Sequence, residues 1–184
     1  MDIVPDTKDW TWVLQRACPE CGLDTGQLPR EAVPRMVRDN AAAWKRVLAT
    51  PGVRRRPRSD VWSALEYACH VRDVFRLFDE RLVLMLTTED ALYPNWDQDE
   101  TASTQRYAEQ DPTDVARDLV AAADTVATRF ESVFGQQWQR TGSRSDGATF
   151  TVESFARYFI HDPVHHLHDV TSTSRSSTPS WPST

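Results

Sequence analysis

The chain has 184 residues, 40% of them hydrophobic, including seven Trp and seven Phe, which fits one core of ordinary domain size. The formal net charge of −6 disfavours nucleic acid as a partner, because binding a polyanion requires a basic face. No apolar stretch approaches the ~20 residues of a membrane span, and no secretory signal is recognised. We therefore expect neither nucleic acid nor a membrane as a partner.

The three cysteines are too few and odd in number for a disulfide framework, and they suit a reducing, cytoplasmic location. Two of them lie in Cys18-Pro19-Glu20-Cys21-Gly22, which has the form of a zinc-ribbon or rubredoxin knuckle. Such a site needs two knuckles, and the sequence has one, with Cys69 as the remaining thiol. We expect a loop with two buried or free thiols; a structural metal and a redox pair remain alternatives.

Helical periodicity first appears over residues 34–48, where apolar residues recur on one face until Pro51-Gly52. The next helix is expected to begin at Ser63, because Ser63 and Glu66 have the spacing of a capping box. Its apolar stripe continues to about residue 86 through Ala68, Val71, Phe75, Phe78, Leu82 and Met85.

A polar connection over residues 93–99 is longer than most loops, which suggests a functional role. Asp111-Pro112 then predicts the start of a third helix, with an N-cap followed by proline at the first helical position. Asp146-Gly147 predicts a small hairpin. A fourth helix is expected from about residue 151 to residue 170.

These elements predict an all-α, four-helix bundle over residues 31–170. Residues 1–30 form a short N-terminal extension that contains the two neighbouring cysteines. Residues 171–184 are nearly all Ser, Thr and Pro, so we expect a disordered tail.

Four of the five histidines lie between His161 and His168, and neutral imidazole is a common ligand of transition metals. At about 100° per residue, His161, His165 and His168 share one side of the fourth helix, and His166 points elsewhere. The fifth histidine, His70, lies on the second helix. The pattern indicates a three-histidine metal centre; a solvated, hydrogen-bonded cluster without metal is the alternative.

A metal-binding imidazole usually donates its other N–H to a carboxylate or carbonyl group. Glu66 and Asp162 are the candidates for this role. Pro163 removes one backbone hydrogen bond within the histidine turn and is expected to bend the helix there.

The pattern Trp62-Ser63-x-x-Glu66-x-x-x-His70, followed by His161-x3-His165-His166, resembles the DinB-like family over about residues 34–170. That family includes metal-dependent hydrolases, mycothiol-dependent maleylpyruvate isomerase and thiol S-transferases. The resemblance implies a four-helix bundle of the DinB type, a divalent ion held by His70, His161 and His165, and a homodimer. Because Pro163 lies within this turn, His168 is the alternative third ligand.

Three histidines leave coordination positions open, as in catalytic sites, and a bound ion there can activate water or a thiol. The resemblance favours a thiol. We therefore expect an S-transferase or isomerase in which Zn, Ni, Fe or Mn activates a low-molecular-weight thiol, such as mycothiol, toward a small electrophile. A metal-dependent hydrolase and a non-catalytic stress protein that binds metal or a small ligand are the alternatives. The side chains expected to face the substrate are Arg157, Tyr158, Trp96 and Tyr93.

Overall fold

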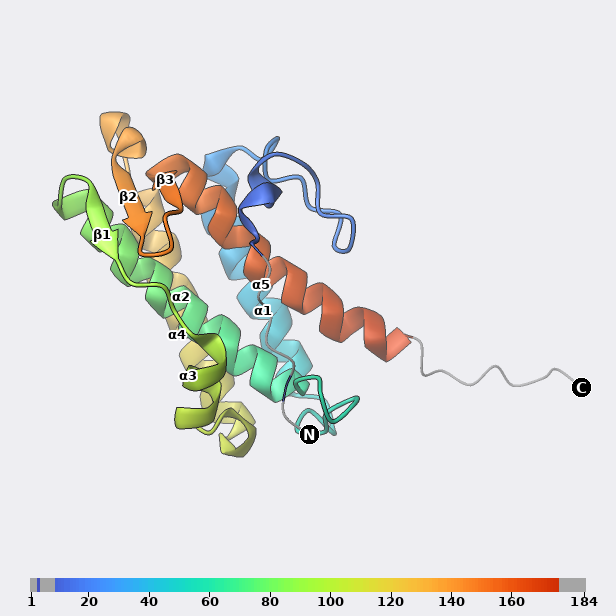
Figure 1. The fold of residues 1–184 in the computed structure, drawn as a ribbon. Helices are drawn as coiled ribbons and strands as arrows, with labels where there is room; N and C mark the ends of the chain where they lie inside the picture. The colour runs from blue at the N-terminus through green and yellow to red at the C-terminus, as the bar shows by residue number, and fades with distance from the viewer. Residues whose placement is uncertain (1–2, 4–8, 176–184) are drawn as a thin grey trace, which may run out of the picture.

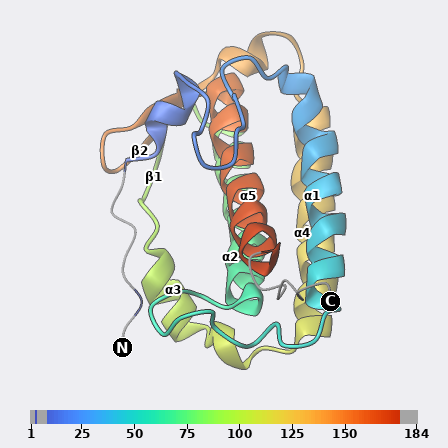
Figure 2. The same cartoon turned by 90° about the vertical axis from the view of Figure 1, so that its right-hand side faces the viewer.

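The computed structural model describes residue 3 and residues 9–175, with side chains as far as residue 172. Four long helices lie alongside one another (Figure 1): α1 (Val33–Leu48), α2 (Ala64–Thr87), α4 (Pro112–Glu131) and α5 (Val152–Arg175). Helix α4 packs against α1 and α2, and α5 packs against the same two helices (Figure 2). The prediction of a four-helix bundle is confirmed.

The helix starts follow from their capping residues. The Ser63 hydroxyl accepts a hydrogen bond from the Glu66 amide at 3.2 Å, and the Ser63 amide donates to the Glu66 carboxylate at 2.8 Å. At the start of α4 the Asp111 carboxylate accepts from the Thr113 amide at 2.8 Å. Both caps satisfy amides that the helix itself leaves without partners, as the sequence predicts.

A small three-stranded sheet covers one end of the bundle. Strands β2 (Thr141–Arg144) and β3 (Thr149–Thr151) pair antiparallel around the predicted Asp146-Gly147 turn. Strand β1 (Ala91–Tyr93) pairs parallel with β2 and is not predicted, because three residues are too few to show an alternating pattern.

Short helices occupy the remaining connections. The predicted polar loop over residues 93–99 contains the end of β1 and the start of α3 (Gln98–Thr104), which the Asp97 carboxylate caps. The 3₁₀ turns are η1 (Thr11–Leu14), η2 (Arg30–Ala32), η3 (Tyr107–Glu109) and η4 (Gly135–Gln139).

Aromatic rings fill the core between α2, α4 and α5. The Phe159 ring lies 4.8 Å from that of Phe78 and 5.7 Å from that of Phe130, measured between centroids. Phe159 and Phe130 are at most 1% exposed. Helix α5 is therefore anchored along its apolar face, and this fixes the direction in which its polar residues point.

Helix α5 forms the C-terminal end of the described chain, and the N-terminal extension packs against it. Turn η1 packs directly against α5 (Figure 1). Helix α5 continues to Arg175, five residues into the predicted tail, and residues 176–184 lie outside the described part of the chain. Within the described residues, no helix has the length and apolar character needed to cross a membrane.

Gly142 in β2 lies against α2 and provides a test of this packing. A Cβ atom at this position would lie 2.7 Å from Cγ of Met85 and 3.0 Å from the Tyr93 ring. Both neighbours are buried, so we expect Gly142→Ala to lower the free energy of unfolding by about 1–3 kcal/mol through overpacking. Urea denaturation measures the change. Thr149→Ala, at an exposed position of β3, is the control; an equal loss in both variants would contradict the explanation.

Candidate functional site

One turn of α5 presents two pairs of metal-binding side chains. His161 and His165 are four residues apart, and so are Asp162 and His166. Residues four apart share a helix face, whereas successive residues point about 100° apart. The two pairs therefore face different neighbours.

Asp162 and His166 face His70 of α2. One donor atom from each of these three residues lies within 4.8 Å of the other two. His70 Nε2 is 3.4 Å from the Asp162 carboxylate, and the His70 and His166 ring centroids are 4.9 Å apart. Burial by itself would raise the pKa of Asp162, but His70 and His166 outweigh it and lower the pKa to about 2. The Asp162 carboxylate is therefore ionised at neutral pH, the form that can coordinate a metal ion.

Aromatic packing holds these imidazoles in place. The Trp96 ring stacks on His70 with 5.3 Å between centroids and 13° between planes, and Trp62 lies 5.4 Å from His70. Trp96 is itself held because its indole N–H donates to the Thr101 hydroxyl at 2.7 Å. The segment predicted as a functional polar loop thus supplies a ring that orients His70.

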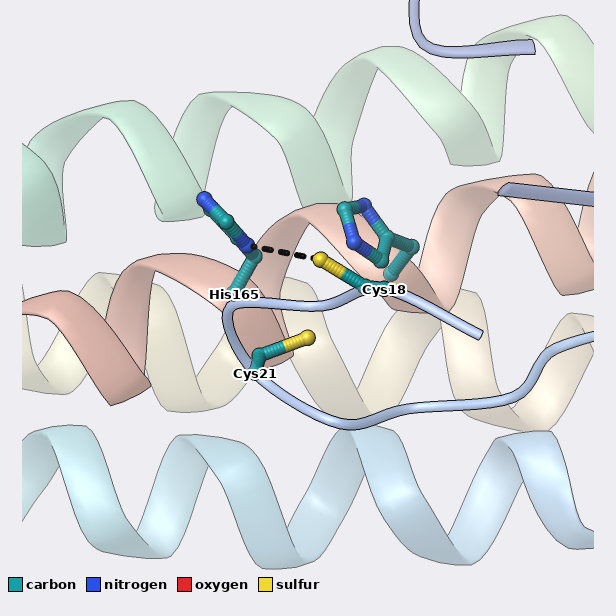
Figure 3. Close-up of side chains that lie close together, drawn as sticks. Cys18, Cys21 and His165 are labelled. Carbon is teal, nitrogen blue, oxygen red and sulfur yellow. Dashed lines mark hydrogen bonds between the residues drawn. The ribbon is translucent and has the colours of Figure 1, made fainter. Parts of the chain in front are cut away.

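His161 and His165 face the N-terminal extension. Their ring centroids are 5.1 Å apart, and donor atoms of both lie within 4.8 Å of those of Cys18 and Cys21. Figure 3 shows the contact between Cys18 Sγ and His165 Nδ1, which are 3.7 Å apart. Burial, together with nearby His165, lowers the pKa of His161 from its ordinary 6.5 to about 4, so His161 is neutral at pH 7.

The structure divides the predicted His70, His161 and His165 trio between two groups. Among the described residues, no group of three donors within 4.8 Å joins His70 to His161 or His165. The helical wheel separates His166 from His165, and the two lie in different groups, but a wheel does not show which pair of α5 residues faces α2. The face of α5 that carries Asp162 and His166 is the face that lies against His70.

Two other candidate ligands lie outside these groups. His168 belongs to neither group, and its side chain is 40% exposed. The Glu66 carboxylate is bound by Arg56, with Nε 2.9 Å from Oε2, and by the Ser63 amide. Of the proposed supporting carboxylates, Asp162 is the one that reaches His70.

A cavity of about 1480 Å³ adjoins both groups. It is lined by side chains of both donor pairs and by Trp96, Tyr158, Arg81 and Arg144. Among the residues expected to face a substrate, Trp96 and Tyr158 line the cavity, whereas Arg157 and Tyr93 do not. Arg157 is turned to the Leu28 carbonyl, to which it donates at 3.0 Å. The Tyr93 ring is buried beneath Arg81.

Arg81 is the functional candidate that the sequence analysis missed. Arg81 is 7% exposed, and its guanidinium donates to the Pro94 carbonyl at 2.7 Å. Within the described residues it forms no ion pair, and its Nε has no hydrogen-bond partner. Burial lowers the pKa of Arg81, which reflects the cost of keeping this charge away from water. The sequence feature that could have identified Arg81 is its position within the apolar stripe of α2, between Phe78 and Leu82, where a charged residue is unexpected.

The Glu66 carboxylate supplies a pH-dependent test of the start of α2. Burial opposes ionisation, but Arg56 and Ser63 outweigh it and lower the pKa of Glu66 below its ordinary 4.5. The resulting stabilisation is present above pH 4.5 and is lost as pH falls through the lower, folded-state pKa. We expect Glu66→Gln to lower the free energy of unfolding by about 1.5–3 kcal/mol at pH 7, and by less below pH 4.5.

Urea denaturation across this pH range measures the difference between the two proteins. Glu131→Gln is the matched control, because Glu131 pairs with Arg38 with about half of its side chain exposed and should contribute less than about 1 kcal/mol. A difference for Glu66→Gln that grows toward acid pH would contradict the assignment.

The comparisons with known proteins agree with this fold. A family model described as the DinB superfamily matches residues 35–170. A search of curated proteins gave no match. Among solved structures, the chain is similar to YfiT from Bacillus subtilis, which is described as a probable metal-dependent hydrolase with an unusual four-helix bundle topology. The identity is 19% and the TM-score 0.71, with 88% of this chain and 93% of that chain covered; at this identity the likeness shows the fold.

Proposed function

The chain belongs to the DinB superfamily, and we propose that it is a metal-dependent hydrolase whose ion is held by His70, Asp162 and His166. The convergence of these three donors within 4.8 Å carries the proposal. Two imidazoles and one carboxylate form a donor set typical of hydrolytic zinc sites, in which a further coordination position stays open. Asp162 and His166 also line the large cavity, so the site is open to a substrate.

The residues present fit such an ion. Asp162 is ionised, His70 is fully buried, and Trp96 and Trp62 restrain its ring. Zn, Ni, Fe and Mn are all compatible with this donor set. When bound there, the ion would lower the pKa of a water molecule and so provide a nucleophile at neutral pH.

The cavity favours a substrate that carries an anionic group. Arg81 is a buried cation without an ion-pair partner in the described part of the chain, and an anion in the cavity would compensate its charge. Trp96 and Tyr158 also line this cavity and supply flat apolar surface. We infer a small substrate with a carboxylate or similar group and an attached apolar portion.

Thiol transfer at the same site is the second candidate, and the cavity volume favours it. Binding sites for one small molecule are typically about 300–1,000 Å³, and this cavity is about 1480 Å³. It has room for two co-substrates, such as mycothiol or another low-molecular-weight thiol together with a small electrophile. His70, Asp162 and His166 would hold the ion in this reaction also.

Replacing His166 tests the proposed metal site. We expect His166→Ala to weaken metal binding by more than the ~10–100-fold that loss of a supporting residue causes, and to abolish metal-dependent turnover. Metal content after dialysis and turnover of a panel of nitrophenyl esters measure the two effects. The matched control is His168→Ala, on the same helix but outside both donor groups.

Parallel assays with an electrophile, with and without mycothiol or other thiols, separate the two reactions. Turnover without added thiol supports the hydrolase, and turnover that requires a thiol supports the transferase. Equal metal content and equal turnover in His166→Ala and the wild type would contradict the site.

Replacing Arg81 tests the inference about substrate charge. For an anionic substrate we expect Arg81→Leu to raise KM by about 10–100-fold, the loss of a charge-assisted hydrogen bond worth about 1.5–3 kcal/mol. For a neutral analogue KM should change little. Arg76→Leu, which removes a half-exposed arginine outside the cavity, is the control. An equal effect of Arg81→Leu on both substrates would show that Arg81 supports the fold rather than binding the anion.

A further inference from the structure

Cys18, Cys21, His161 and His165 form a second group, separate from the site of the proposed hydrolase. We propose that these four residues bind a structural Zn²⁺ ion in a tetrahedral Cys₂His₂ site. The spacings Cys18-x2-Cys21 and His161-x3-His165 are those of Cys₂His₂ zinc sites. The second knuckle that the sequence analysis expected to be necessary is replaced by one turn of α5.

The cysteine loop has the backbone of a metal-binding knuckle. The Cys18 amide donates to the Leu23 carbonyl at 2.9 Å, and the Gly22 amide donates to the Cys18 carbonyl at 2.8 Å. Gly22 has a φ of 76°, a left-handed conformation that glycine adopts without steric cost. This turn brings both sulfur atoms to the side of the loop that faces His165 (Figure 3).

The orientation of His165 is that of a metal ligand. Its Nδ1 faces Cys18 Sγ at 3.7 Å, close to the ~3.5 Å that separates sulfur and nitrogen at a tetrahedral zinc with ~2.3 and ~2.0 Å bonds. Its other nitrogen, Nε2, lies 3.5 Å from the Glu20 carboxylate and 3.6 Å from that of Asp169. Metal-binding histidines commonly donate the second N–H to a carboxylate in this way.

His161 provides independent support for an ion at this position. It is 3% exposed, and its Nε2 has no hydrogen-bond partner within the described residues. A buried polar atom without a partner has lost its hydrogen bonds to water without replacing them, so such atoms are rare in folded proteins. Trp10 packs against the rings of both His161 and His165, at 5.3 and 5.1 Å between centroids, and shields the group from water.

The donor set selects the metal and explains its role. Two thiolates with two imidazoles favour zinc, and four protein ligands leave no position for a substrate. Each thiol loses its proton to solvent as it binds the ion, so no oxidant is required. The ion would attach the N-terminal extension to α5; Trp10, Thr11 and Leu14 of that extension line the large cavity, so the zinc would hold one of its walls in place.

Cobalt substitution of the full-length, reduced protein tests the proposal. In the wild type we expect one Co²⁺ per chain to bind this site, in addition to the ion of the proposed hydrolase site, and to show sulfur-to-cobalt charge-transfer bands and the intense visible bands of tetrahedral cobalt. Cys21→Ser and His161→Ala should each lose these bands. Cys69→Ser, which changes a buried cysteine outside the group, should keep them.

His166→Ala separates this proposal from the proposed function. It removes a ligand of the other site, so it should lower the total metal content while the sulfur-to-cobalt bands persist. Absence of those bands in cobalt-saturated wild type, or their survival in Cys21→Ser, would overturn the zinc site and leave the hydrolase proposal standing.

Protection of the Cys18 and Cys21 thiols in the wild type tests the zinc site without relying on the folding of a variant. Zinc should prevent maleimide labelling of Cys18 and Cys21, as mapped by mass spectrometry, and a chelator should restore it. Equal labelling with and without zinc would overturn the proposal.

Discussion

The pitch of one α-helix determines how the polar interior of this protein is arranged. In α5 two donor pairs with the same four-residue spacing are offset by a single residue, so they diverge by about 100°. Asp162 and His166 reach His70 of α2, while His161 and His165 reach the cysteine loop. The aromatic packing of Phe159 against α2 and α4 fixes the rotation of α5, and both donor groups depend on that rotation.

Helix α2 supports the same arrangement with a row of buried polar residues. Glu66, His70 and Asp73 follow one another at spacings of four and three residues, on one helix face. Each has a partner from a different segment: Glu66 has Arg56, His70 has Asp162, and Asp73 accepts from the Tyr107 hydroxyl at 2.6 Å. Burying these groups is tolerable because each is paired, and the pairings attach the inter-helix loop, α5 and η3 to α2.

Capping motifs in the sequence were sufficient to predict where two of the long helices begin. The capping box at Ser63 and the Asp111-Pro112 start place two helices to within a residue or two, because caps act on the adjacent backbone. Strand β1 escaped prediction, because its pairing with β2 is made by residues about 50 positions away. The histidine cluster was recognisable from spacing, but which pair of α5 residues faces His70 depends on packing between helices, which a single-helix wheel does not contain.

The cysteine loop shows why half of a site is hard to interpret from sequence. A Cys-x2-Cys turn supplies two ligands, and the other two lie more than 130 residues later, on a helix that the resemblance had assigned to a different ion.

The two donor groups share one neighbouring carboxylate. Asp169 lies 3.6 Å from His165 and 3.4 Å from His166, so one carboxylate faces an imidazole of each group. Because each imidazole becomes a stronger N–H donor when it binds a metal, an ion in either group would draw Asp169 toward that group's histidine. The N-terminal loop and the cavity are thereby connected through a single side chain.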